Sequence, residues 1–100
     1  MISFPVIVAD YQGQRYLVAM LGQKTNWVRN LRADGGRAVL RSGGPESVSL
    51  VEDLSDNRAA ILRRYLELAP GARPFFPIDG RAPLDDFARI VDQYPVFRVA

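Results

Sequence analysis

The fold is decided by residues 4–21, which read FPVIVADYQGQRYLVAML. Two apolar runs, residues 4–9 and 15–21, are separated only by a polar turn in which Gly13 can adopt a positive φ. Short apolar runs bounded by turn residues are typical of strands, and two strands joined so closely pair as an antiparallel hairpin. Because the second run is apolar on both faces, we expect it in the centre of a sheet.

The rest of the chain alternates between helical and strand patterns. The expected elements are, in order, strands at residues 4–9 and 15–21, a helix at 26–34, strands at 37–42 and 46–52, helices at 56–68 and 83–92, and a strand at 95–99. Thr25 and Ser55 are suitable N-caps for the first two helices, and Pro83 suits the first turn of the third. The order ββαββααβ, with tight turns between consecutive strands, predicts an α+β domain in which helices flank an antiparallel β-barrel.

The composition limits the chemistry available to the protein. The 100 residues, of which 48% are hydrophobic, suffice for one compact domain. Cysteine and histidine are absent, which excludes disulfides, thiolate nucleophiles, a Ser-His-Asp triad and imidazole zinc ligands, so an enzymatic reaction would depend on a bound cofactor. We assign no catalytic residue and no metal site. The net charge of +2 is too small to indicate nucleic acid, and neither a membrane span nor a signal pattern is found, so we expect a cytoplasmic protein.

The loop that follows the second strand is the first candidate site. Gly22 allows a ligand to approach the backbone, and the N-terminus of the following helix favours an anion. Lys24 adds a positive charge and Trp27 a flat surface. The alternative is an ordinary strand–helix connection, in which Trp27 belongs to the core together with Val28 and Leu31.

Two further segments are candidates. One is the polar face of the first helix, which carries Asn26, Arg29 and Asn30 and is joined by Arg32, Arg37 and Arg41. The alternative there is a solvated surface. The other is the aromatic segment that contains Arg73, Phe75 and Phe76. These rings either close the end of the barrel or form the wall of an apolar pocket for a planar cofactor or substrate.

Two stretches of the sequence resemble a signature of the deazaflavin-dependent nitroreductase family. Residues 16–22 read YLVAMLG and residues 26–33 read NWVRNLRA. Members of that family carry a strand ending in Ala-x-x-Gly, a loop, and then W-x-x-N-L-(R/K)-A at the start of a helix. The ending YPVFRV, at residues 94–99, resembles the family's final strand, and Pro70-Gly71 resembles its mid-domain turn. The resemblance therefore covers nearly the whole chain.

The resemblance implies a single split β-barrel domain over residues 1–100 that binds a deazaflavin (coenzyme F-420) or, alternatively, FMN. On this basis we expect an oxidoreductase that transfers a hydride from reduced deazaflavin to a nitro or quinone-like acceptor. The residues expected to bind the cofactor are Ala19, Met20, Leu21, Gly22, Lys24, Asn26, Trp27 and Asn30, and those expected to line the substrate pocket are Arg73, Phe75 and Phe76. The alternative function is a non-catalytic split-barrel module that binds a flavin or serves in dimerisation.

The chain departs from the family pattern at its start. Family members begin with a helix and a G-R-x-(S/T)-G-x-x-R stretch that helps to bind the phosphate-bearing tail, whereas this sequence starts at Met1, where that stretch would end. We therefore expect both features to be missing. Open sheet edges and exposed apolar surface favour self-association, and flavin-binding relatives are often homodimers, so we also expect a homodimer.

Overall fold

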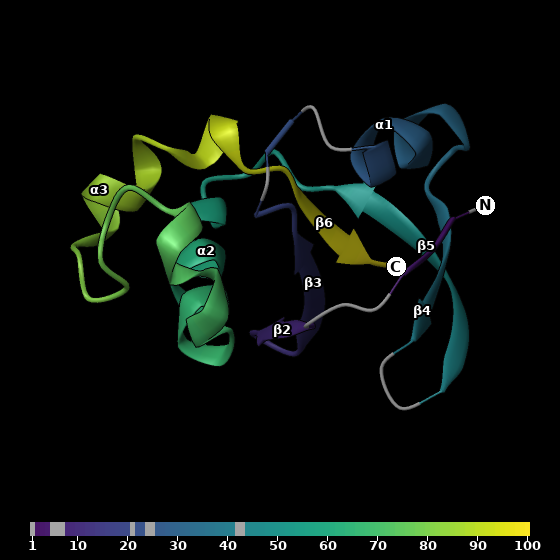
Figure 1. Cartoon of the computed structure of the whole chain (residues 1–100), viewed down its shortest axis with the longest axis horizontal. Coiled ribbons are helices and arrows are strands. Elements are labelled where there is room, and N and C mark those ends of the chain that lie inside the picture. Colours follow the sequence, from purple (N-terminus) through teal and green to yellow (C-terminus); the bar gives the residue numbers. More distant parts are fainter. Residues whose placement is uncertain (1, 5–7, 21, 24–25, 42–43) are drawn as a thin grey trace.

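The computed structural model describes residues 2–4, 8–20, 22–23, 26–41 and 44–100 (Figure 1). The strands are β1 (Ile2–Phe4), β2 (Ala9–Tyr11), β3 (Gln14–Val18), β4 (Arg37–Arg41), β5 (Pro45–Glu52) and β6 (Val96–Val99). The α-helices are α1 (Asn26–Ala33), α2 (Arg58–Leu68) and α3 (Leu84–Ala88), and 3-10 helices lie at η1 (Pro70–Phe75) and η2 (Val91–Gln93).

The strands form one sheet in the order β1-β4-β5-β6-β3-β2. Every neighbouring pair is antiparallel except β1 and β4, which run parallel. The expected α+β class with a largely antiparallel sheet is therefore confirmed. The described strands form an open sheet with β1 and β2 at its edges, and they do not close into a barrel.

The expectation of a single strand over residues 4–9 is wrong. β1 ends at Phe4 and β2 begins at Ala9, and the two pair at opposite edges of the sheet, so three strands rather than two precede α1. The chain from Phe4 to Ala9 makes five Cα–Cα steps and spans at most about 18 Å, whereas the edge strands of a flat six-stranded sheet lie about 24 Å apart. The edges formed by β1 and β2 must therefore approach each other, so the sheet is curled.

The hairpin between β2 and β3 is confirmed, although it is shorter than expected. Tyr11 pairs with Gln14, and the two residues between them, Gln12 and Gly13, have φ values of 50° and 78°. Positive φ at both central positions defines the type I′ turn that suits the twist of a hairpin. β3 lies between β6 and β2, as expected for an interior strand, and it ends at Val18, before the expected limit.

Side chains of β3 point alternately into two separate cores. Leu17 and Ala19 contribute to a cluster beneath α1, which we call the α1 core, together with Val28, Leu31, Ala38, Leu40, Leu50, Phe97 and Val99. Tyr16 and Val18 contribute to the α2 core, which contains Ile61, Leu62, Tyr65, Leu66, Phe76, Phe87 and Tyr94. Figure 1 shows α1 at one end of the molecule and the pair α2 and α3 at the other, with the sheet between them. The part of the strand that faces a core on each side, Tyr16–Val18, is apolar and buried, whereas Gln14 and Arg15 at its start are exposed.

The second helix ends at residue 68 as expected but begins later than expected, and the third helix is shorter than expected at both ends. Ser55 does not cap α2, which begins at Arg58 without a side-chain cap. The backbone N–H and hydroxyl of Ser55 instead donate to Asp53 Oδ1 over 2.7 and 2.6 Å, which fixes a turn before the helix. Pro83 precedes α3 rather than lying within it, and the helix gives way after Ala88 to a turn and then η2. Thr25, the expected cap of α1, lies outside the described residues.

No helix in the described part of the chain has the length and apolar character required to cross a membrane.

Candidate functional site

A pocket of about 270 Å³ brings together two segments that the sequence singled out separately. Met20 and Gly22 come from the loop after β3, Phe75 comes from the end of η1, and Gln93 and Tyr94 come from the segment between η2 and β6. We call this the aromatic pocket. It lies where the loop before α1 meets the elements that follow α2.

Gly22 is required by the local geometry of the pocket. Its φ of 94° lies in the left-handed region, which non-glycine residues rarely adopt. A Cβ added at this position would lie 3.3 Å from the backbone oxygen of Gln93, so the two backbone segments are in close contact. The N–H of Gly22 donates to the oxygen of Ala19 over 3.0 Å, which completes a tight turn at the end of the strand.

Tyr94 holds the aromatic wall of the pocket in place. Its hydroxyl donates to the carbonyl oxygen of Phe75 over 2.7 Å, and its ring stacks on Phe76 with a centroid distance of 4.2 Å. Burial raises the pKa of the Tyr94 hydroxyl, which therefore stays protonated and remains a donor near neutral pH. The Phe75 ring is 49% exposed, so an aromatic face is available at the pocket.

The other residues of the expected substrate pocket lie elsewhere. Phe76 is buried in the α2 core between Tyr65 and Tyr94, which corresponds to the packing alternative for this ring. Arg73 lines a separate pocket of about 480 Å³ between α2 and the segment after η1. The structure therefore brings Phe75, but neither Phe76 nor Arg73, to the loop after β3.

The remaining expected cofactor residues are distributed over the loop and α1. Ala19 is fully buried in the α1 core, and Trp27 is partly buried with its ring 5.7 Å from that of Phe97. Asn26 and Asn30 are exposed on α1, away from the residues that line the aromatic pocket. Leu21 and Lys24 lie outside the described residues.

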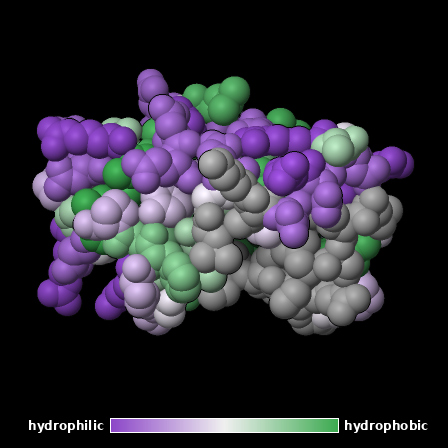
Figure 2. Space-filling view, turned by 45° about the horizontal axis from the view of Figure 1, so that its top comes forward, coloured by the Kyte–Doolittle hydropathy of each residue, from purple (hydrophilic) through white to green (hydrophobic). Residues whose placement is uncertain are grey.

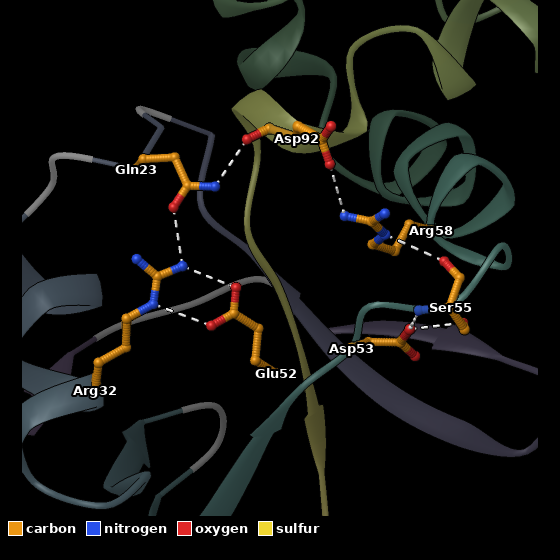
Figure 3. A network of polar contacts seen from close by, with 7 residues as sticks. All are labelled: Gln23, Arg32, Glu52, Asp53, Ser55, Arg58 and Asp92. Atoms are coloured by element: carbon orange, nitrogen blue, oxygen red, sulfur yellow. Dashed lines mark hydrogen bonds and ion pairs between the residues drawn. The ribbon is translucent and has the colours of Figure 1, made fainter.

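A polar network fixes the loop after β3 to the rest of the domain (Figure 3). The Gln23 amide nitrogen donates to the Asp92 backbone oxygen over 2.7 Å, and its oxygen accepts from Arg32 over 2.8 Å. Arg32 also forms an ion pair with Glu52 at 2.8 Å, and hydrogen bonding to that carboxylate raises the pKa of Arg32. Arg58 reaches the other side of Asp92, with 3.2 Å between Nη1 and Oδ1. The loop and the segment that carries Gln93 are thus tied together.

Sequence reasoning missed Gln93, Tyr94 and the contacts of Gln23. Tyr94 belongs to the ending that resembles the family's last strand, but nothing in the local pattern places its hydroxyl against η1. Arg32 belongs to the helix motif, and its partners are 9 and 20 residues away in sequence. These contacts arise only when β5, α1 and η2 converge.

The lining of the aromatic pocket favours binding of a flat ring over acid–base chemistry. Tyr94 supplies the one ionisable side chain among the described lining residues, and its hydroxyl already donates to the Phe75 carbonyl oxygen. Among the described residues no group of three acidic side chains could hold a metal ion. The described lining is at least as polar as it is apolar: Met20, Phe75 and Tyr94 supply apolar and aromatic surface, and Gln93 with backbone groups supplies polar contacts. A planar organic ligand with a polar edge can use both kinds of contact.

Comparison with models of protein families, with curated proteins and with solved structures finds no match to this chain. The functional argument therefore rests on the site itself.

Proposed function

We propose that the aromatic pocket binds the ring system of a deazaflavin (coenzyme F-420), or alternatively of FMN, and that the protein is an oxidoreductase. The observation that carries the proposal is that Met20, Gly22 and Phe75 line one pocket, although they come from segments about fifty residues apart. The bound cofactor would supply the hydride, and the acceptor would be a nitro or quinone-like compound.

The residues of the pocket have distinct tasks in this proposal. Phe75 presents an aromatic face to the ring, and Tyr94 fixes the backbone of Phe75 through the hydroxyl contact. Because Gly22 has no side chain, the loop packs closely against the Gln93 backbone, which brings the two segments together at the pocket. The exposed amide of Gln93 can both donate to and accept from the polar edge of a ring.

The size and charge of the pocket limit what it can hold. Ligand pockets usually measure about 300–1,000 Å³, so a volume of about 270 Å³ suits a ring rather than a complete cofactor. Among the described residues that line the pocket none is cationic, so in this proposal the phosphate-bearing tail is held by residues other than these five. The proposal also includes a split-barrel relationship and a homodimer, for which the curled sheet and the unpaired edges β1 and β2 are the support.

The first experiment measures binding. Purified protein is titrated into oxidised deazaflavin and, separately, into FMN, and the cofactor fluorescence is followed. We expect binding at micromolar concentrations, and we expect Phe75→Ala to weaken it about 5-fold or more, since stacking on an aromatic side chain contributes about 1–3 kcal/mol. Leu54→Ala is the matched control, because Leu54 is 72% exposed and lies outside the pocket. Binding of neither cofactor, or equal losses in both variants, would contradict the proposal.

The second experiment separates an enzyme from a binding module. Reduced cofactor is mixed with the protein and a nitro or quinone-like acceptor, and cofactor oxidation is followed with and without the protein. Acceleration that Phe75→Ala reduces is expected for the oxidoreductase. Tight binding without acceleration would instead support the non-catalytic split-barrel module.

A further inference from the structure

Arginine supplies nearly all the positive charge of this protein. Some of the arginine residues form ion pairs and others do not. The sequence holds twelve arginines and one lysine. In the described part of the chain, the arginines that form ion pairs are Arg15, Arg32, Arg37, Arg58, Arg64 and Arg89. Those that form none there are Arg29, Arg63, Arg73, Arg81 and Arg98. Three of these five, Arg63, Arg73 and Arg81, line a single pocket of about 480 Å³, which we call the arginine pocket.

Three different elements bring these arginines together. Arg63 lies on α2, Arg73 lies in η1, and Arg81 lies in the turn before α3. Leu66 of α2 also lines the pocket, and a Cβ added at Gly80 would lie 3.6 Å from the Leu66 Cβ, so the turn packs directly on the helix. Figure 2 shows hydrophilic side chains across the width of one face of the molecule.

The two acidic residues of the lining leave a net charge of +1 at the pocket (three arginines against Glu67 and Asp79), and neither forms an ion pair with these arginines in the described structure. Glu67 forms its ion pair with Arg64, at 3.0 Å. Asp79 accepts a hydrogen bond from the backbone N–H of Arg81 over 2.9 Å, which closes a local turn. In the described structure Arg63, Arg73 and Arg81 therefore line one cavity, and none of them is ion-paired with a carboxylate.

We infer that the arginine pocket binds the phosphate group of a small phosphorylated sugar or polyol. Guanidinium groups offer a fork of N–H donors that matches phosphate oxygens, and such charge-assisted hydrogen bonds are among the stronger polar contacts in proteins. The cavity is much larger than a phosphate ion, which leaves room for an organic part. The carboxylates of Glu67 and Asp79 accept hydrogen bonds from hydroxyl groups and repel a second anionic group.

This inference does not depend on the cofactor proposed above, because the aromatic pocket and the arginine pocket share no lining residue. The test uses ribose 5-phosphate as the probe, at constant ionic strength, with isothermal titration and amide chemical shifts as readouts. Ribose and inorganic phosphate serve as partial ligands. Saturable binding of ribose 5-phosphate that is tighter than that of either partial ligand is expected. Equal binding of inorganic phosphate, or of ribose, would overturn the inference.

Variants locate the binding. Arg73→Gln and Arg81→Gln replace exposed side chains and should keep the fold, and each should weaken ribose 5-phosphate binding about 10-fold or more. Arg63→Gln should act in the same way. The matched control is Arg29→Gln, which removes the same charge from an exposed and unpaired residue on α1. An equal loss in Arg29→Gln would mean non-specific charge attraction and would overturn the inference.

A competition experiment identifies the source of the phosphate. Displacement of ribose 5-phosphate by FMN but not by riboflavin would assign the pocket to the ribityl phosphate of a bound cofactor. If ribose 5-phosphate stays bound in the presence of FMN, the pocket serves a separate phosphorylated metabolite. Phe75→Ala should leave ribose 5-phosphate binding unchanged, so a failure of the cofactor proposal and a failure of this inference can be told apart.

Discussion

The path of β5 through the sheet depends on Gly36. β5 pairs with β4 up to Ser49 and with β6 from Leu50 onwards, and Gly36 lies beside this change of partner. The N–H of Leu50 donates to the oxygen of Gly36 over 2.7 Å. A Cβ added at Gly36 would lie only 2.3 Å from the Leu50 oxygen, a distance that no folded arrangement tolerates. Gly36→Ala must therefore displace backbone, and we expect it to be strongly destabilising.

The neighbouring glycine isolates the steric contribution. Gly35 has a φ of 70° and Gly36 a φ of 86°, so alanine at either position incurs left-handed backbone strain of about 1–2 kcal/mol. At Gly35 an added Cβ meets no atom within 4 Å. At Gly36 the backbone must also move by about 1 Å and lose the hydrogen bond to Leu50, which adds about 1–3 kcal/mol. Gly36→Ala should thus cost about 2–5 kcal/mol in the free energy of unfolding, against about 1–2 kcal/mol for Gly35→Ala.

Urea denaturation followed by tryptophan fluorescence measures this difference. Trp27 is the single tryptophan, and it packs against Phe97 at the edge of the α1 core, so its emission reports the unfolding of the region that Gly36 affects. We expect a midpoint well below that of Gly35→Ala with a similar slope. Equal midpoints for the two variants would refute the reasoning, because they would show that the contact with Leu50 relaxes without cost.

Two further predictions concern the cores. Leu17→Asp places an unpaired charge at a position that is 1% exposed in the α1 core, and circular dichroism should show no cooperative thermal transition at neutral pH, whereas Leu54→Asp, at an exposed position, should melt like the parent protein. Burial raises the pKa of Tyr65 and of Tyr94 above 10.0, so their contribution to stability is fully present below pH 10.0 and is lost as the pH rises through the values in the folded protein. An absorbance titration should show a late ionisation that is missing from the double variant Tyr65→Phe/Tyr94→Phe. If the absorbance lost in the double variant titrated with the unshifted midpoint of 10.0, the assignment would be contradicted.

Most helices and strands were predictable from the sequence because each is indicated by residues within its own segment. α1, β4, β5 and β6 each begin and end within one residue of the expected positions. Their apolar residues recur at helical or alternating spacing, and this spacing can be recognised within one segment without knowing which elements pack against it. The pairing of β1 with β4 carries no such signal, because the two strands are more than thirty residues apart and only the curled sheet brings them together. The start of α2 was misplaced because Ser55 bonds to Asp53, a neighbour that competes with the helix.

In the candidate site, too, single residues could be recognised from the sequence, whereas the contacts between distant segments could not. The sequence marked Gly22 and Phe75 as separate features, and the structure places them in one pocket because η1 folds back onto the loop after β3. The arginine pocket was not found from the sequence. Arg63 there looks like one residue of a solvated helix face, and Arg81 like part of a turn, until α2 and the turn before α3 pack together.

A single segment, η1, determines the shape of both pockets. Phe75 faces the aromatic pocket and Arg73 faces the arginine pocket. Residues two apart on a 3-10 helix point in different directions, so one short element supplies both walls. Pro70 and Pro74 restrict the backbone of η1 and contribute no amide hydrogens, which leaves few hydrogen bonds to fix it. Its position therefore depends on the hydroxyl of Tyr94 and on the stacking of Phe76, and a change at either anchor should alter both pockets together.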